Sequence, residues 1–235
     1  MSGWAARRFW SQVTVEAAEG GHILRLDGRE LRTPAKASLI LPTRALADMV
    51  AQEWRAQEGT IRPDTMPATR AANAAVDKVR GQAAEVADLI AAYGATDLLC
   101  YRADAPAALI AQQAAAWDPL LDWSARRFGI RWEVTTGVMP LTQPQLTLDV
   151  LSAHVASFGA FELTALHDLV AMSGSLVIGL AATEGQAEPE ELWRVSRIDE
   201  DWQISQWGAD EEAAALAESR RQSFLEAYRF FVACR

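Results

Sequence analysis

The sequence predicts an α+β fold in which a small N-terminal α/β domain with an antiparallel sheet is followed by a larger all-helical bundle domain. In the first 42 residues, apolar and polar side chains alternate with the period of two that is typical of half-buried strands. From Ala68 onward alanine is dense and apolar residues recur at helical spacing. The segment from Gly59 to Pro67, with two prolines, separates these regions and is typical of a loop. We therefore predict domains at residues 1–65 and 66–235.

The N-terminal domain is expected to contain a sheet and one helix. Four short runs favour strands, with a hairpin turn at Asp27-Gly28 between the second and the third: Val13 to Val15, His22 to Leu26, Arg29 to Thr33 and Ser38 to Leu41. Pro42 ends the last run, and Thr43 is a suitable N-cap for a helix. The apolar positions of that helix are Leu46, Met49, Val50 and Trp54.

The second domain is expected to be a bundle of helices with short connections. Apolar periodicity predicts helices near residues 68–79, 82–93, 106–128, 144–157, 161–183, 189–206 and 210–232. One segment, Arg131 to Thr136, has a strand-like pattern instead. It is either an additional strand of the first domain's sheet or a loop between helices, and the sequence does not distinguish these two arrangements.

The length and composition describe a globular chain that needs no covalent cross-link. Its 235 residues are half hydrophobic, and such a length buries roughly 70% of the unfolded surface. Cys100 and Cys234 are far apart and lack CxxC or metal-ligand spacing, which indicates a reducing compartment. No apolar run approaches the roughly 18 residues of a membrane span, and no signal-peptide core follows the first residues. We expect a cytoplasmic protein without membrane insertion.

Several classes of chemistry lack support in the sequence. Neither phosphate-binding loop, G-x-x-x-x-G-K-[ST] or G-x-G-x-x-G, is present, so we expect no nucleotide and no cofactor. The three histidines are isolated and no H-E-x-x-H motif occurs, so we expect no metal. The net charge of −9 argues against binding to nucleic acid. The small residues of Gly174 to Gly179 are interpreted as a close contact between helices.

The negative charge is concentrated near the C-terminus. Residues 184–218 contain eleven carboxylates and two arginines, so this segment carries the whole net charge of −9. If residues 189–206 form one helix, its core-facing stripe is Leu192, Val195, Ile198 and Trp202. The opposite face then carries Trp193, Glu200, Asp201 and Ile204. An apolar spot at Trp193 and Ile204 with acids around it is typical of a protein-binding surface.

The acids that follow also have a local structural interpretation. Gly208 is suited to end one helix and Asp210 to cap the next, with Glu211 and Glu212 in its first turn. The helix dipole there favours each acid by about 0.3 to 1 kcal/mol. This interpretation does not exclude a binding role. Two other functions stay open: an enzyme that uses a carboxylate pair across a cleft, and a general holdase with a flexible or methionine-rich apolar surface.

An ordered set of motifs resembles the Atp12 family of assembly chaperones for the F1 sector of ATP synthase. The set covers nearly the whole chain: RFW at Arg8 to Trp10, LDGRELRTPA at Leu26 to Ala35, LPTRALADMVAQEW at Leu41 to Trp54, the loop from Pro63 to Pro67, TDLLCYRA at Thr96 to Ala103, WDPLLDW at Trp117 to Trp123, GSLV at Gly174 to Val177 and DEDWQISQWGADEEA at Asp199 to Ala213. Each motif is common by itself, but their order is specific.

This resemblance implies a function without catalysis. Family members bind the unassembled F1 α subunit, shield its β-contacting interface and release it as the hexamer forms, without nucleotide. Mitochondrial members carry a targeting sequence before the RFW motif, so the seven residues found there imply a bacterial, cytoplasmic member. The family's acidic W-G motif matches Trp207, Gly208, Asp210 and Glu212, although Ala209 stands where a further carboxylate is expected. The expected client-binding residues are Trp193, Glu200, Asp201, Ile204, Trp207, Asp210, Glu211 and Glu212, with Arg29 and Arg32 as lesser candidates.

Overall fold

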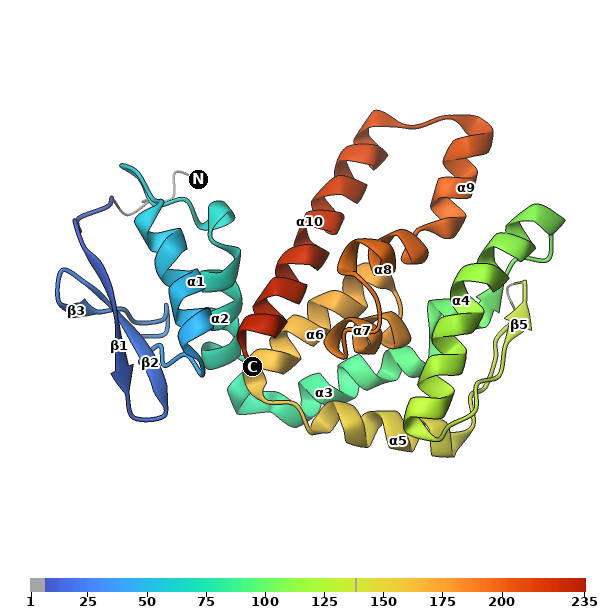
Figure 1. Ribbon diagram of the computed structural model, residues 1–235, viewed down its shortest axis with the longest axis horizontal. Coiled ribbons are helices and arrows are strands. Elements are labelled where there is room, and N and C mark those ends of the chain that lie inside the picture. Colours follow the sequence, from blue (N-terminus) through green and yellow to red (C-terminus); the bar gives the residue numbers. More distant parts are fainter. Residues whose placement is uncertain (1–6, 138) are drawn as a thin grey trace. The chain divides into compact units, whose positions relative to one another are not determined.

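The computed structural model describes residues 7–137 and 139–235, and the chain divides into two compact units. The first unit comprises Met1–Ala83, Gly159–Ala165 and Arg229–Arg235, and the second comprises Ala84–Phe158 and Leu166–Tyr228. A small antiparallel sheet at the N-terminus and a mostly helical remainder confirm the predicted fold class (Figure 1). The predicted domain boundary between residues 65 and 66 stays a prediction.

The sheet of the first unit has three antiparallel strands in the order β1-β2-β3. Their bounds are Val13–Ala18, Gly21–Leu26 and Arg29–Glu30. The predicted turn joins β2 to β3, with positive φ at both Asp27 (47°) and Gly28 (81°), as the right-handed twist of a hairpin requires. The predicted run from Ser38 to Leu41 contributes only two isolated bridges, Arg32 to Ser38 and His22 to Leu41.

Two helices complete most of the first unit. Helix α1, Arg44–Arg55, begins as predicted at Thr43, whose hydroxyl accepts a hydrogen bond of 3.1 Å from the amide of Leu46. Helix α2 spans Pro67–Asp77. The carboxylate of Glu53 on α1 accepts hydrogen bonds from the amides of Ala68 and Thr69 at 2.7 and 2.8 Å, and it thereby caps the N-terminus of α2.

The remaining helices lie in the second unit, except that Ala83 at the start of α3, the first residues of α6 and the last residues of α10 are counted with the first. Their bounds are α3 Ala83–Ala91, α4 Ala107–Phe128, α5 Gln145–Ala156, α6 Ala160–Ser173, α7 Leu176–Thr183, α8 Pro189–Ser196, α9 Ile198–Trp207 and α10 Glu211–Ala233. Short 3-10 turns lie at Pro63–Thr65, Val79–Gln82, Ala92–Thr96 and Leu98–Cys100. No helix among the described residues is both long enough and apolar enough to cross a membrane.

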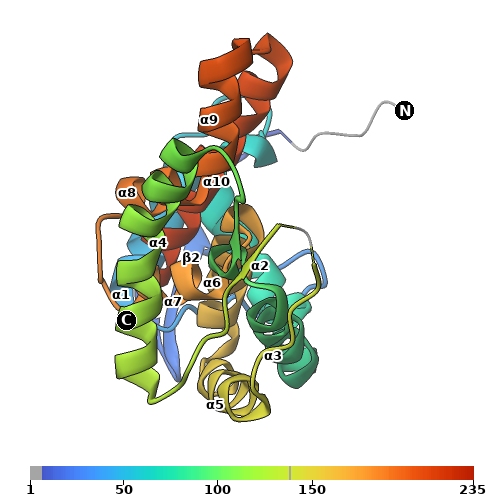
Figure 2. The ribbon, with the colours of Figure 1, turned by 90° about the vertical axis from the view of Figure 1, so that its right-hand side faces the viewer.

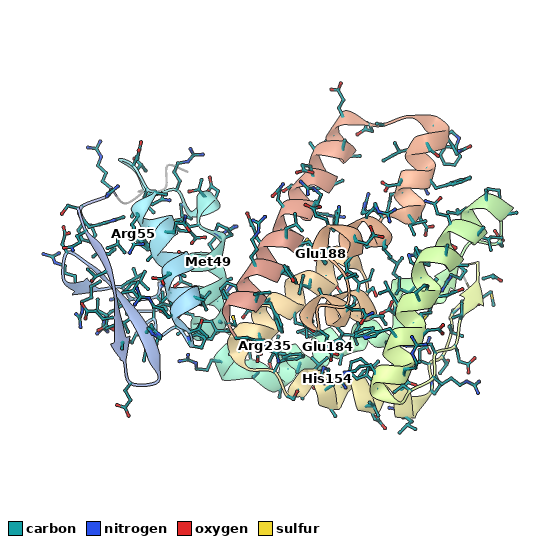
Figure 3. The ribbon with its side chains drawn as sticks, in the orientation of Figure 1. Met49, Arg55, His154, Glu184, Glu188 and Arg235 are labelled. Carbon is teal, nitrogen blue, oxygen red and sulfur yellow. The ribbon has the colours of Figure 1, made fainter. Side chains whose placement is uncertain are left out.

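Helix α7 forms the centre of the second unit, since all of its residues are buried. Gly179 lets it approach α6 closely, because a Cβ atom at this position would lie 2.4 Å from Cγ2 of Val170. This confirms the interpretation of the small residues as a helix contact. At the C-terminal end of α7, Glu184 pairs with Arg127 of α4 at 2.7 Å and lies 3.8 Å from Nε2 of His154 on α5 (Figure 3).

Two predicted helices are each divided in the structure. The predicted helix 161–183 ends at Ser173, because Gly174 adopts a positive φ of 71° and Ser175 then caps α7. The buried carboxylate of Asp97 holds this break, since it accepts hydrogen bonds from the Ser175 hydroxyl at 2.7 Å and from the Val177 amide at 3.0 Å. The predicted helix 189–206 is divided at Arg197, whose φ of −108° and ψ of 9° are not helical.

The undecided segment, Arg131 to Thr136, takes neither of the two expected forms. Its last two residues form β5, Thr135–Thr136, which pairs in parallel with β4, Tyr101–Arg102, in the second unit. The segment therefore contributes a strand, but to a separate two-stranded sheet and not to the sheet of the first unit.

Candidate functional site

The most exposed continuous part of the second unit is the turn that joins α9 to α10. Every residue from 203 through 216 is exposed, and we call this segment the tip. In both ribbon views the tip lies beyond the end of α4 (Figures 1 and 2). It carries three large apolar side chains with substantial exposure: Trp207 at 80%, Leu216 at 55% and Ile204 at 41%.

The base that carries the tip is held by several contacts within the second unit. The ring of Trp193 on α8 packs against Phe224 of α10, with 5.8 Å between the ring centroids. Arg221 of α10 pairs with Glu190 of α8 at 2.6 Å, and the side chain of Gln113 on α4 donates to Asp199 of α9. These contacts fix both helices below the tip, so the tip is presented from a rigid base.

Local chemistry explains why the chain turns at the tip. Gly208 ends α9 with a φ of 90°, and its amide donates to the carbonyl of Ile204 at 2.9 Å. The carboxylate of Asp210 then accepts a hydrogen bond of 2.7 Å from the amide of Ala213, and α10 begins at Glu211. The predicted capping arrangement is therefore confirmed. Its acids are nevertheless exposed, so capping leaves them accessible to a partner.

The tip carries negative charge only. Its carboxylates are Asp210, Glu211 and Glu212, and the segment contains no lysine or arginine. None of these three forms an ion pair with another described residue. Below the tip, Glu200 is neutralised by Arg197 at 2.7 Å, whereas Asp201 is exposed. The surface thus combines uncompensated acids with exposed apolar side chains.

One predicted member of this surface is misplaced. Trp193 is only 6% exposed and belongs to the core of the second unit, so the predicted apolar spot of Trp193 and Ile204 is wrong. The packing of α8 against α10 is the physical reason, because Phe224 of α10 covers the Trp193 ring, whereas Ile204 lies on α9, beyond the break at Arg197. The predicted core stripe is otherwise confirmed, with Ile198 buried and Trp202 packed against the core.

Sequence reasoning also missed one residue of the tip. Leu216 lies in an alanine-rich part of α10, eight residues before Phe224, where the buried stripe of that helix begins. An isolated leucine that precedes the aromatic stripe is the signal that was available. Leu216 remains exposed because the part of α10 that precedes Phe224 lies outside the core of the unit.

The two lesser candidates lie in the first unit, whereas the tip belongs to the second. Arg29 is exposed and its guanidinium carbon lies 5.9 Å from the centroid of the Phe9 ring. Arg32 is also exposed and donates to the carbonyl of Lys36 at 3.1 Å.

The groups with reactive chemistry do not form a catalytic arrangement around the tip. The acids of the tip are exposed to solvent, whereas the catalytic carboxylic acid of such an enzyme typically lies in an apolar pocket. Burial raises the pKa of both thiols, Cys100 and Cys234, to about 12, so neither supplies a thiolate at neutral pH. Within residues 7–137 and 139–235, no group of three or more His, Cys, Asp or Glu side chains is arranged to hold a metal ion.

Comparison with known proteins gives consistent matches. The family model described as "ATP12 chaperone protein" matches residues 7–125. A curated relative, "Protein atp12, mitochondrial" of Schizosaccharomyces pombe, is 23% identical over 219 residues, which cover 88% of this chain and 75% of the relative. The solved structure of Atp12 from Paracoccus denitrificans is 48% identical with a TM-score of 0.96, covering 98% of this chain and 99% of that one. An aspartate-to-lysine mutant of the same protein matches with the same identity and TM-score, covering 98% of both chains.

Proposed function

Because this chain belongs to the ATP12 chaperone family, we propose that it is an assembly chaperone which binds the unassembled F1 ATP synthase α subunit. In this function it shields the β-contacting interface of the α subunit until the F1 hexamer forms. The main observation that supports a binding role for particular residues is the composition of the tip. Exposed apolar side chains and uncompensated acids occur there together on a rigid base.

The apolar side chains of the tip are suited to supply affinity. Interfaces typically depend on a few aromatic anchors that become buried in the complex, and Trp207 is 80% exposed in the free chain. Ile204 and Leu216 extend this apolar surface. Because the base fixes α9 and α10 below the tip, little ordering of the chaperone is required when a client binds.

The acids of the tip are suited to orient the client and to accelerate its association. Charges at the rim of an interface act mainly on the association rate and on specificity, and their effect decreases with salt. A client must finally leave an assembly chaperone, so a modest interface with a polar rim serves this function better than a large hydrophobic one. Asp210, Glu211 and Glu212 provide such a rim.

The two alternative functions have weaker support. An enzyme with a carboxylate pair needs at least one acid in an apolar, water-poor site, whereas Asp201 and the tip acids are exposed. A general holdase typically presents a methionine-rich adaptable surface. The tip contains no methionine.

Co-purification tests the proposed function. The tagged chain is expressed with the F1 α or the F1 β subunit of the same organism, and each mixture is separated by size exclusion in moderate salt. We expect the α subunit to elute with the chain and the β subunit to elute alone. Retention of neither subunit, with both partners folded, would contradict the proposal. Equal retention of both subunits and of an unrelated unfolded protein would indicate a general holdase.

A further inference from the structure

A second exposed aromatic side chain lies in the first unit, far along the sequence from the tip. Phe9 is 61% exposed, and two exposed arginines are close to it, Arg7 in the sequence and Arg29 against its ring. We call Phe9, Arg7 and Arg29 the Phe9 patch. Figure 3 labels Arg55 at the end of α1, and the segment before β1 is held against this helix, because Arg8 donates to the carbonyl of Arg55 at 3.3 Å and Trp10 packs on Trp54.

Phe9 is held in its exposed position by its two neighbours. The guanidinium of Arg8 donates to the carbonyls of Gln57 at 2.6 Å and of Trp10 at 3.0 Å, and the Arg8 amide donates to the carbonyl of Gly59 at 2.7 Å. Trp10 is only 3% exposed. The ring of Phe9 packs edge-to-face on Trp10, with 5.2 Å between the centroids. This pre-organisation lowers the ordering cost of an interaction through Phe9.

The patch is positively charged. The guanidinium carbon of Arg29 lies 5.9 Å from the centre of the Phe9 ring. Among the described residues, neither Arg7 nor Arg29 forms an ion pair with a carboxylate. The nearby acid, Asp27, uses its carboxylate oxygens to accept the amides of Ser11 and Gln12. Arg7 and Arg29 are therefore available to a negatively charged partner, whereas the guanidinium groups of Arg8 and Arg55 donate to backbone carbonyls.

The charge of the whole first unit agrees with this local character. The first unit contains fourteen Lys and Arg against ten Asp and Glu, a net charge of +4. The second unit contains eight against twenty-one, a net charge of −13. The two units thus present surfaces of opposite charge, and each carries an exposed aromatic residue.

We propose that the Phe9 patch is a second interaction surface that binds an acidic segment of the client protein. In the complex, the arginines hydrogen-bond to carboxylates of that segment, and Phe9 packs against an apolar side chain between them. The identity of the client rests on the proposed function. A nucleic acid fits less well because the chain as a whole has a net charge of −9.

A second copy of this chain also has a suitable acidic surface, because its tip combines Trp207 with three carboxylates. Such a contact would join two different surfaces, and a head-to-tail contact of this kind continues into a filament unless its rotation closes a ring. A client molecule ends the interaction after one contact, so we commit to the client as the partner of the Phe9 patch.

Affinity measurements with matched variants test this inference. The dissociation constant for the α subunit is measured by calorimetry for the wild-type chain, for Phe9→Ala and Arg29→Glu in the patch, and for Trp207→Ala in the tip. Arg70→Glu is the control, since Arg70 is an exposed arginine of the same unit outside the patch. We expect each patch variant to weaken binding by about tenfold or more and the control to stay within about twofold. Thermal unfolding verifies that each variant is folded, and Phe9→Leu replaces Phe9→Ala if the latter is not.

The possible results separate the two proposals. If the patch variants bind as the wild type does while Trp207→Ala binds more weakly, the Phe9 patch proposal is wrong and the proposed function stands. If the wild-type chain does not bind the α subunit, the proposed function fails, and this inference fails with it. Self-association of the wild-type chain in sedimentation that Phe9→Ala abolishes, with unchanged affinity for the α subunit, would assign the patch to a second copy and overturn the inference.

Discussion

Replacement of Trp207 by alanine is expected to weaken binding of the α subunit strongly without destabilising the chain. A tryptophan side chain buries about 200 Å² when it is fully covered, and 80% of Trp207 is exposed before binding. About 160 Å² is therefore available to a partner, which corresponds to about 4 kcal/mol at about 25 cal/mol per Å². This value is an upper limit, so we expect a loss of about 2 to 4 kcal/mol, or about thirtyfold to a thousandfold in the dissociation constant.

The assay combines calorimetric binding with denaturant unfolding, and Trp193 provides a matched control. Because Trp207 contacts little in the free chain, Trp207→Ala should change the free energy of unfolding by no more than about 0.5 kcal/mol. Trp193 is 6% exposed and packs on Phe224, so Trp193→Ala should lower the free energy of unfolding by about 3 to 5 kcal/mol. A Trp207→Ala variant with wild-type affinity for the α subunit would refute the assignment of the tip as the anchor.

Three further changes have defined outcomes. Asp210→Ser combined with Glu212→Gln keeps a capping side chain but removes two charges. Capture of the α subunit in size exclusion should therefore weaken and become less sensitive to salt, while the thermal midpoint stays within about 2 °C of the wild-type value. An unchanged salt dependence would show that these acids do not face the client. Gly179→Ala places a Cβ atom 2.4 Å from the side chain of Val170 and should lower the free energy of unfolding by about 1 to 3 kcal/mol. Gly81→Ala is the control, because its Cβ atom would meet nothing within 4 Å and should not lower this free energy. Equal stabilities of the two variants in denaturant would contradict the close helix contact. Burial raises the pKa of Asp97 to about 6, so the folded state disfavours its ionised form. The contribution of Asp97 to stability is therefore present below pH 4 and is lost as the pH rises through 6. Urea unfolding across this range should show a decrease of about 2 to 3 kcal/mol in the free energy of unfolding that is absent in Asp97→Asn.

Local signals in the sequence predicted the N-terminal hairpin and the caps of particular helices. The turn at Asp27-Gly28 and the cap at Thr43 depend on the chemistry of the residues themselves, so they could be read without tertiary contacts. The capping by Asp210 belongs to the same class. Such features involve hydrogen bonds between residues only a few positions apart, and the residue types specify them directly.

The features that were missed depend on contacts between distant residues. The break at Gly174 is held by Asp97, which precedes it by almost eighty residues, and apolar periodicity continues through the break. The pairing of β4 with β5 also joins segments far apart in sequence. For the candidate site, the composition located the acidic segment, but it did not distinguish the buried Trp193 from the exposed Trp207. That distinction depends on how α8 packs against α10.

Site-specific photo-crosslinking at position 207 tests most directly whether the tip contacts the α subunit. A photoreactive amino acid replaces Trp207 in cells that produce both F1 subunits, and a second chain carries it at Leu146, which is 69% exposed in the same unit. The account predicts a covalent adduct with the α subunit from position 207 and little or none from position 146. An adduct with the β subunit alone, or equal α adducts from both positions, would contradict the assignment of the tip as the surface that binds the α subunit.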